Sequence, residues 1–314
     1  MSNLRLLWRE WRMPMRNAFI DELVVAAETN ENIALVVGDL GYGVVEQFAN
    51  RFPNRFFNAG VAEQNMMGLS AGLASEGFHV FAYSIANFPT FRCAEQIRND
   101  VDYHNLSVTV VAVGGGLAYG NLGYSHHAVQ DYALMRVMPN MLIAAPGDPM
   151  EVRACMRYLV SNPQPSYLRL GKSGESCIHV EVPEVSPGKW LKVRVGEEGG
   201  ATYLTTGTTL ELINTMFDKN TNLKIYGLST MPLWGMNAKH SQTEQIEKFE
   251  QVITIEDHLM DGGFGSWLLE AATIRPELLP RIKIKALDQK VCGMVAKQST
   301  LNTQGGLTYE MLLF

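Results

Sequence analysis

Cysteine is scarce in this sequence of 314 residues, and the four cysteines that occur are far apart. They stand at positions 93, 155, 177 and 292, so no two of them form a Cys-x-x-Cys pair. This spacing argues against a cysteine zinc site and against a disulfide framework. We therefore expect free thiols in a reducing compartment, the cytoplasm.

Positive charge and long apolar runs are also lacking. The chain has 26 Lys and Arg against 32 Asp and Glu, a net charge of -6, and no basic cluster. A nucleic-acid groove is therefore not expected. No uncharged run reaches the length of a membrane span, and the first twelve residues carry too much charge for a signal peptide. These absences predict a soluble, cytoplasmic protein without a membrane or nucleic-acid partner.

Apolar runs of strand length alternate with segments of helical periodicity along the chain. Strands are expected near 33–37, 79–83, 106–113, 141–145 and 166–170, and again near 201–206, 223–228, 252–256 and 282–287. Helices are expected near 15–29, 44–50, 63–72, 89–100, 150–160, 210–217, 243–249, 265–273 and 305–313. Glycine and proline interrupt the alternation between 171 and 189. The pattern predicts an α/β fold of two consecutive domains, 1–182 and 183–314, each a mostly parallel sheet flanked by helices.

One stretch places a single carboxylate at the start of an otherwise apolar helix. It reads Asn-Ala-Gly-Val-Ala-Glu-Gln-Asn-Met-Met-Gly from Asn58 to Gly68, and the carboxylate is Glu63. A glutamate that stabilises the helix N-terminus is the simpler interpretation. However, the following residues are nearly free of charge, which indicates a buried helix. A carboxylate there needs a hydrogen-bonded partner, and a ligand with a basic nitrogen would supply one.

The same stretch resembles the pyrimidine-domain signature of the transketolase family of thiamine-diphosphate enzymes. The likeness extends from about Met15 to the C-terminus and is strongest through Leu170. It implies the thiamine-diphosphate pyrimidine-binding fold, followed by a transketolase C-terminal-like fold. In that family the glutamate contacts N1′ of the aminopyrimidine and promotes the tautomer that deprotonates the thiazolium C2. The resemblance assigns this cofactor-binding and catalytic role to Glu63.

A second segment, from Ser84 to Arg98, follows an expected strand and opens a helix. Aromatic residues at such a strand exit can line a ligand crevice, although ordinary core packing is the alternative. The segment resembles the family's aromatic pocket and has the same Glu-Gln-Ile-Arg ending. By this alignment Phe88 stacks on the aminopyrimidine, Phe91 lies beside it, and Ile85 replaces the family's first aromatic.

Histidines follow a glycine-rich stretch that would let the backbone approach a ligand closely. The segment from Ser125 to Met141 resembles the family's Thr-His-Gln run and its continuation. On that alignment His126 contacts the substrate and is a candidate for proton transfer. His127 stands at the substrate-site glutamine of the family, and Asp39 matches the acidic residue near the thiazolium. Exposed loop positions for the histidines, and a capping role for Asp39, are the alternatives.

Two arginines are candidates for binding phosphate, because a guanidinium fork matches phosphate geometry. Arg169 ends an apolar strand, where a charge needs a partner, and it resembles the family arginine that holds the sugar phosphate. Arg92 matches an arginine used for phosphate in the related deoxyxylulose-phosphate synthases. A surface ion pair is the alternative for each.

The part of the site that would read the sugar departs from the family. Gly114 stands where transketolases usually have a histidine at the end of a strand. Leu122 falls near an acidic residue that reads substrate hydroxyls, and Gly43 near a phosphate-contacting serine. A modified sugar or another acceptor is therefore plausible.

The family's metal motif, Gly-Asp-Gly, does not occur in this sequence. We therefore assign no metal-binding residue to this chain. The resemblance implies thiamine diphosphate and Mg²⁺, with the metal held mainly by a separate diphosphate-binding N-terminal transketolase subunit. It also implies active sites at the interface of an α₂β₂ heterotetramer.

The expected function is transfer of a two-carbon ketol unit from a ketose phosphate to an aldehyde acceptor, in carbohydrate metabolism. Two alternatives stay open. One is the beta subunit of the decarboxylating component of a 2-oxoacid dehydrogenase, which has a similar length and a thiamine glutamate. The other is an inactive transketolase-like paralogue, for which the changes at Gly114 and Leu122 speak.

Overall fold

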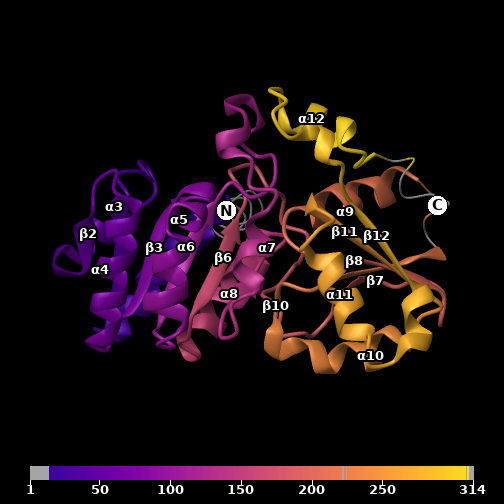
Figure 1. Cartoon of the computed structure of the whole chain (residues 1–314), viewed down its shortest axis with the longest axis horizontal. Helices are drawn as coiled ribbons and strands as arrows, with labels where there is room; N and C mark the ends of the chain where they lie inside the picture. The colour runs from indigo at the N-terminus through magenta and orange to yellow at the C-terminus, as the bar shows by residue number, and fades with distance from the viewer. Residues whose placement is uncertain (1–13, 221–222, 224, 309, 311–314) are drawn as a thin grey trace, which may run out of the picture.

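Two sheets, each flanked by helices, lie side by side in the computed structural model (Figure 1). The structure describes residues 14–220, 223, 225–308 and 310. In the described residues no helix is long and apolar enough to cross a membrane. The expected α/β class with two mostly parallel sheets is confirmed.

The first sheet has seven strands in the order β10-β5-β6-β4-β3-β1-β2. Its strands from the first half of the chain pair in parallel. They are β1 (Ile33–Val37), β2 (Phe56–Asn58), β3 (His79–Ile85), β4 (Val108–Val113), β5 (Leu142–Ala144) and β6 (Ser166–Leu170). The β-branched runs of β1 and β4 are buried along their whole length, as expected of strands covered on both faces.

Helices connect these strands. They are α2 (Met15–Thr29), α3 (Glu46–Arg51), η1 (Pro53–Arg55), α4 (Glu63–Ser75), α5 (Asn87–Phe91), α6 (Ala94–Gln96), η2 (Ile97–Asp102), η3 (Gly120–Leu122), η4 (Tyr124–His126), α7 (Asp131–Arg136) and α8 (Pro149–Ser161). Pro149 at the first position of α8 and the Asp148 carboxylate, which accepts from the Glu151 N–H at 2.8 Å, begin that helix.

The second sheet has five strands in the order β12-β11-β8-β9-β7. They are β7 (Leu191–Arg194), β8 (Ala201–Thr205), β9 (Gly227–Thr230), β11 (Gln251–Leu259) and β12 (Ile282–Leu287). Of these five strands, β7 pairs antiparallel with β9, and the other pairs are parallel. The accompanying helices are α9 (Thr209–Lys219), η6 (Met236–Ser241), α10 (Gln242–Ile246), α11 (Phe264–Ala272), η7 (Pro276–Arg281), η8 (Gln289–Val291) and α12 (Gln298–Gln304).

The two sheets are coupled by a strand that returns to the first. Strand β10 (Leu233–Gly235) comes from the second half of the chain and pairs antiparallel with β5. Its Trp234 is fully buried, with its ring 5.1 Å from Tyr132 and 5.3 Å from Phe264. Sequence periodicity misses this three-residue strand. The boundary between 182 and 183 stays a prediction, because β10 lies beyond it and still belongs to the first sheet.

Two expected helices differ in the structure. The segment expected as one helix at 89–100 is divided into α5, α6 and η2, because Cys93 leaves helical geometry between the first two. The helix expected at 305–313 is replaced by α12, which ends at Gln304. Gly305 and Gly306 stop it, and Gly306 has a φ of +87°. Residues 309 and 311–313 of that expectation lie outside the described part of the chain.

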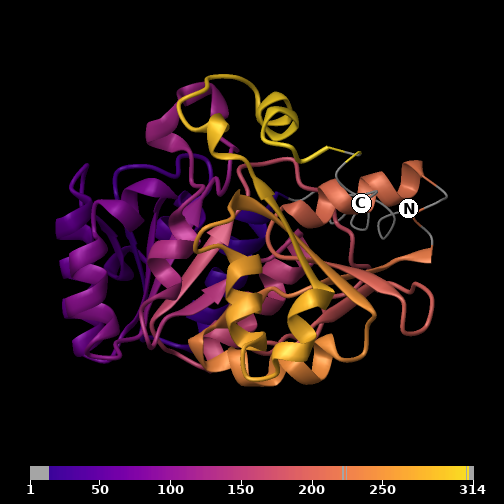
Figure 2. The ribbon, with the colours of Figure 1, turned by 45° about the vertical axis from the view of Figure 1, so that its right-hand side comes forward.

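The candidate site lies where the strands of the first sheet end. The connections after β1, β3, β4 and β6 leave the sheet at its carboxyl edge, where crevices form in parallel sheets. The loop after β4 is braced by the C-terminal region: the Ala296 N–H donates to the Gly120 carbonyl at 3.3 Å. Figures 1 and 2 show the C-terminal helix α12 beside this loop.

Candidate active site

Glu63 is the first residue of α4 and is only 6% exposed. Its Oε1 accepts a hydrogen bond from Arg92 at 2.9 Å. Its other carboxylate oxygen has no hydrogen-bond partner among the described residues. A hollow of about 440 Å³ lies beside the carboxylate, lined by Ala62, Glu63, Gln64, Asn65 and Arg92. The helix N-terminus and Arg92 together stabilise a negative charge at this position.

Arg92 joins Glu63 to the aromatic segment after β3. Its guanidinium carbon lies 4.0 Å from the centre of the Phe88 ring. Phe88 in turn meets the ring of His126 edge-on at 5.2 Å. A second hollow of about 290 Å³ is lined by Asn87, Phe88, Phe91, Arg92, Tyr124, Ser125 and Gln130. The fold therefore brings Glu63, Phe88 and His126 together from three separate segments.

The remaining residues expected near the cofactor lie along the same edge. Asp39 follows β1 with a φ of +55°, and its carboxylate accepts from the Asn58 amide at 2.9 Å. The Asn58 side chain also accepts from the Asp39 and Gly60 N–H groups, which fixes the turn before Glu63. Ile85 ends β3 and is half-buried, while Phe91 is 46% exposed.

His126 is half-buried and faces aromatic neighbours on two sides. Besides Phe88, the Tyr119 ring lies 6.1 Å away, and the Ser125 hydroxyl is 3.0 Å from Nδ1. Burial, with the charges of Arg92 and His127 in addition, holds the pKa of His126 below its usual value of 6.5. The imidazole is therefore neutral at pH 7, the form that can accept a proton.

The structure places His127 differently from the expectation of a substrate contact. Its ring is 1% exposed, and its Nε2 is 3.4 Å from the Gly120 carbonyl. Its own carbonyl accepts from Asn87 at 2.7 Å. In this position His127 holds the loop after β4 against α5, and its ring does not line either hollow.

Arg169 also has partners other than a ligand phosphate. Its guanidinium is buried and donates to Asp131 at 2.7 Å and to Asp257 at 2.6 Å. The remaining donors reach the Tyr132 hydroxyl and the carbonyls of Ala128 and Asp257. All five N–H groups are thus used. In this arrangement Arg169 ties the first sheet to β11 of the second.

Three residues that sequence reasoning left out, Tyr119, Lys172 and Arg16, lie near His126. Lys172 follows β6, and its ammonium nitrogen lies 4.6 Å from the centre of the Tyr119 ring. Arg16 stands in the first turn of α2, and its charge acts on the hydroxyls of Tyr83 and Tyr119. A cation in a first helical turn opposes the helix dipole, and this was the available sequence signal.

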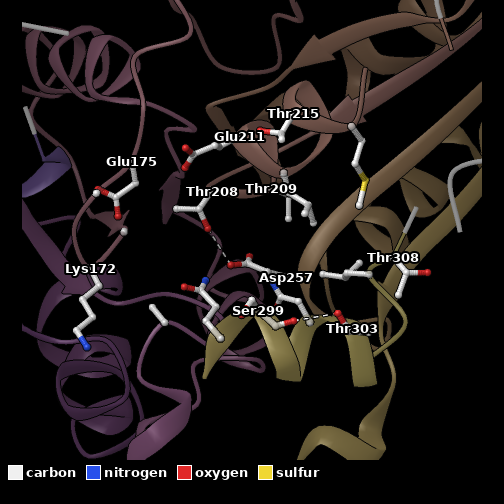
Figure 3. Close-up of a pocket in the computed structure, with 18 of the residues that line it drawn as sticks. Lys172, Glu175, Thr208, Thr209, Glu211, Thr215, Asp257, Ser299, Thr303 and Thr308 are labelled. Carbon is white, nitrogen blue, oxygen red and sulfur yellow. Dashed lines mark hydrogen bonds between the residues drawn. The ribbon is translucent and has the colours of Figure 1, made fainter. Parts of the chain in front are cut away.

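Lys172 also borders the largest cavity described, about 600 Å³ between the two sheets (Figure 3). Its wall carries Glu175, Thr208, Glu211, Asp257 and several residues of α12. The Thr208 hydroxyl donates to Asp257 at 3.1 Å, on the carboxylate oxygen that Arg169 leaves free. This cleft is polar and continuous with the end of β6.

A metal site is not formed by the described residues, since they contain no group of three or more His, Cys, Asp or Glu side chains arranged to hold an ion. The positions that depart from the family are placed as follows. Gly114 is covered by the Tyr119 ring, Leu122 is 50% exposed, and nothing among the described residues lies within 4 Å of a Cβ built at Gly43.

Comparison with known proteins agrees with this arrangement. Residues 12–174 match the family model "Transketolase, pyrimidine binding domain". A protein of Methanocaldococcus jannaschii named as a transketolase C-terminal section is 35% identical over 82% of this chain and 81% of its own length. One of the two kinds of chain of an apulose-4-phosphate transketolase, from Phocaeicola vulgatus, is 32% identical over 83% of this chain and 84% of its own length.

A solved structure described as a split-gene transketolase, in an inactive β4 tetramer, has the same fold. It shares 28% identity and a TM-score of 0.80, and the superposition covers 95% of each chain. The matched region of the family model contains Glu63, Phe88 and His126. The chain belongs to the transketolase family.

Proposed function

We propose that this chain is the pyrimidine-binding subunit of a two-chain transketolase that moves a two-carbon ketol unit from a ketose phosphate to an aldehyde. The observation that carries the proposal is the Glu63 carboxylate. It is buried at a helix N-terminus, keeps one oxygen without a partner among the described residues, and borders a hollow next to Arg92 and Phe88. These features fit an aminopyrimidine, which offers a basic ring nitrogen and a flat face.

Thiamine diphosphate, when bound, supplies the nucleophilic carbon that takes up the two-carbon unit. Glu63 would hold the pyrimidine nitrogen through a hydrogen bond, with Asp39 at the same edge of the sheet. Phe88 would stack on the ring, and Phe91 and Ile85 would complete the apolar wall. Arg92 keeps Glu63 charged through its 2.9 Å contact. His126, neutral at pH 7, would accept or return a proton at Nε2, because its Nδ1 is engaged by Ser125.

The phosphate of the sugar needs a cation with free donors. Arg169 uses all its donors within the protein, whereas Lys172 has no carboxylate within ion-pair distance among the described residues. Arg16 has a buried Nε without a hydrogen-bond partner in the described part of the chain. We therefore assign the phosphate to Lys172 and Arg16. A substrate contact by Arg92 and His127 stays a prediction.

A second subunit is part of the proposal. The described residues offer no set of Mg²⁺ ligands, and Mg²⁺ requires several oxygen ligands. We assign the metal and the diphosphate to a separate N-terminal subunit, in an α₂β₂ heterotetramer in the cytoplasm. The β4 form of the similar split-gene transketolase is named inactive, which supports a need for the other chain. The apulose-4-phosphate relatives make that branched ketose phosphate a donor to test beside linear ones.

Native mass spectrometry of the complex, purified from its own cells through a tag on this chain, tests the assembly. We expect a second subunit together with the masses of thiamine diphosphate and Mg²⁺. The purified complex should then transfer a ketol unit from a ketose phosphate to an aldehyde. A homo-oligomer that binds no cofactor would refute the proposal. A requirement for a lipoyl-domain partner would instead identify a 2-oxoacid dehydrogenase component.

A further inference from the structure

Tyr119 lies directly on the glycine that replaces a family histidine. A Cβ built at Gly114 would stand 2.1 Å from Cε2 of the Tyr119 ring, and Gly114 has a φ of +84°. Any other residue at position 114 would therefore displace the ring and strain the backbone. The phenol thus fills, from the loop after β4, the space at the strand end where transketolases usually have the histidine.

The neighbours of the Tyr119 ring are those of a substrate-reading residue. The His126 ring lies 6.1 Å from one side of it, and the Lys172 ammonium lies 4.6 Å from its centre. Tyr119 is half-buried, and its hydroxyl has no hydrogen-bond partner among the described residues. A half-buried phenol between a histidine and a lysine therefore keeps one donor free.

Positive charge gathers at the same place. Arg16 lies close enough to Tyr119 and Tyr83 for its charge to act on both hydroxyls. Within the described part of the chain, the carboxylate beside Arg16 is that of Glu175, which also accepts from the Met15 N–H at 3.4 Å. Arg16 and Lys172 together outnumber this single negative charge. The cluster of two cations and two phenols is therefore suited to an oxygen-rich anion.

We propose that Tyr119 is a specificity-determining residue, whose hydroxyl donates a hydrogen bond to the phosphorylated end of the sugar held by Lys172 and Arg16. This inference rests on the proposed ketol transfer. It gives the substitution of Gly114 a meaning: the donor moves from the strand end to the loop, and a neutral phenol replaces an imidazole. The ring also closes the space above Gly114, so that the phosphate lies against a wall rather than in an open cleft.

Tyr119→Phe tests the hydroxyl, because it keeps the packing on Gly114. In the complex with the second subunit, kcat/KM is measured for glyceraldehyde 3-phosphate and for glyceraldehyde. We expect a loss of about tenfold to a hundredfold for the phosphorylated aldehyde, as for other hydrogen bonds to charged groups, and less than about threefold for the other. Tyr103→Phe, at a tyrosine that is 78% exposed, is the matched control. An unchanged ratio of the two aldehydes would overturn the inference.

Gly114→Ala tests the contact between the two residues. The added methyl should push the ring away and lower the same ratio as Tyr119→Leu does. In the Tyr119→Leu background, Gly114→Ala should lower the ratio no further, although the strained backbone lowers the stability of both variants alike. Independent, multiplying losses in the double variant would show that the two positions do not act together.

A binding measurement separates this inference from the proposed function. If the complex transfers no ketol unit, the proposed function fails. The dissociation constant of inorganic phosphate, measured by calorimetry on the same complex, still decides the role of Tyr119. Weaker phosphate binding in Tyr119→Phe, with unchanged binding in Tyr103→Phe, would support it. Equal dissociation constants in all three proteins would refute it.

Discussion

Arg169, in the last part of β6, donates a hydrogen bond of 2.6 Å to the carboxylate of Asp257 in β11. The pair is buried, with side-chain exposures of 2% and 3%, and it connects strands of the two sheets. Asp131 completes the arrangement at 2.7 Å and also accepts from the Tyr167 hydroxyl at 2.6 Å. Two carboxylates thus balance one guanidinium where the sheets meet.

Arg169→Met should lower the free energy of unfolding by about 3–5 kcal/mol, because it leaves buried carboxylates without their cation. Urea unfolding followed by circular dichroism measures this. Arg51→Met, which removes an exposed pair with Glu28, should cost less than about 1 kcal/mol. If the folded Arg169→Met protein had normal stability and a raised KM for phosphorylated substrates, the phosphate role expected from the sequence would hold instead.

Glu63→Gln should lower kcat of the reconstituted complex by about 10²- to 10⁴-fold, since a neutral amide cannot supply the charge that supports proton transfer. The far-ultraviolet circular dichroism spectrum should stay unchanged. Glu76→Gln, at the exposed end of the same helix, is the control and should keep full activity. A Glu63→Gln complex with full activity would remove the central argument for this site.

The pH dependence of kcat/KM should reveal His126. Because burial and nearby positive charge lower its pKa below 6.5, the form that accepts a proton predominates above that pH. Activity should therefore fall on acidification, with a midpoint below 6.5. His126→Asn should remove this acidic limb and lower the plateau, whereas His104→Asn, at an exposed histidine, should change neither. A limb with the same midpoint in His126→Asn would assign it to another group.

Stability should fall as the pH rises from about 5 to 7. Burial raises the pKa of the Glu151 carboxyl to about 7, although the charge of His179 opposes this shift. The folded protein therefore keeps a proton that the unfolded chain loses near pH 4.5. The free energy of unfolding then decreases with pH, by at most about 1.4 kcal/mol per unit for one proton.

Glu151→Gln should flatten this slope, because the amide does not titrate. Urea unfolding at pH 5, 6, 7 and 8 measures it. Glu181→Gln, at an exposed position in the segment before β7, is the control. Two neighbours titrate in the same cluster: His179, which the Asp148 carboxylate contacts at 3.1 Å, and Asp148 itself. A slope that persists in Glu151→Gln would place the proton on one of them.

The motif around Glu63 shows why part of the site was readable in advance. A charge at the mouth of an apolar helix, and aromatics after a strand, are local features, so their secondary structure fixes where they stand. The parallel sheet then brings the ends of β1, β3 and β4 to one edge. The positions of Glu63, Phe88 and His126 relative to one another followed from this rule, while their chemical roles stay proposals.

Arg169 and His127 show the limit of that reasoning. Both stand at chain positions that favour a ligand contact, yet both are buried among partners from distant segments. The carboxylate that faces Arg169 lies 88 residues further on, and periodicity gives no sign of it. The short strands β7 and β10 were missed for a similar reason, since three or four residues are too few for a reliable pattern.

The sequence by itself determined the alternation of strands and helices, the transketolase-type motif and the residues that end the strands, because each depends on neighbours in the chain. Tertiary structure alone decided which cations remain free for a ligand. Arg169 is occupied because two carboxylates meet it between the sheets, whereas Lys172 and Arg16 are left beside Tyr119. Pairing of charges depends on distances in space, and these distances arise only when both sheets are assembled.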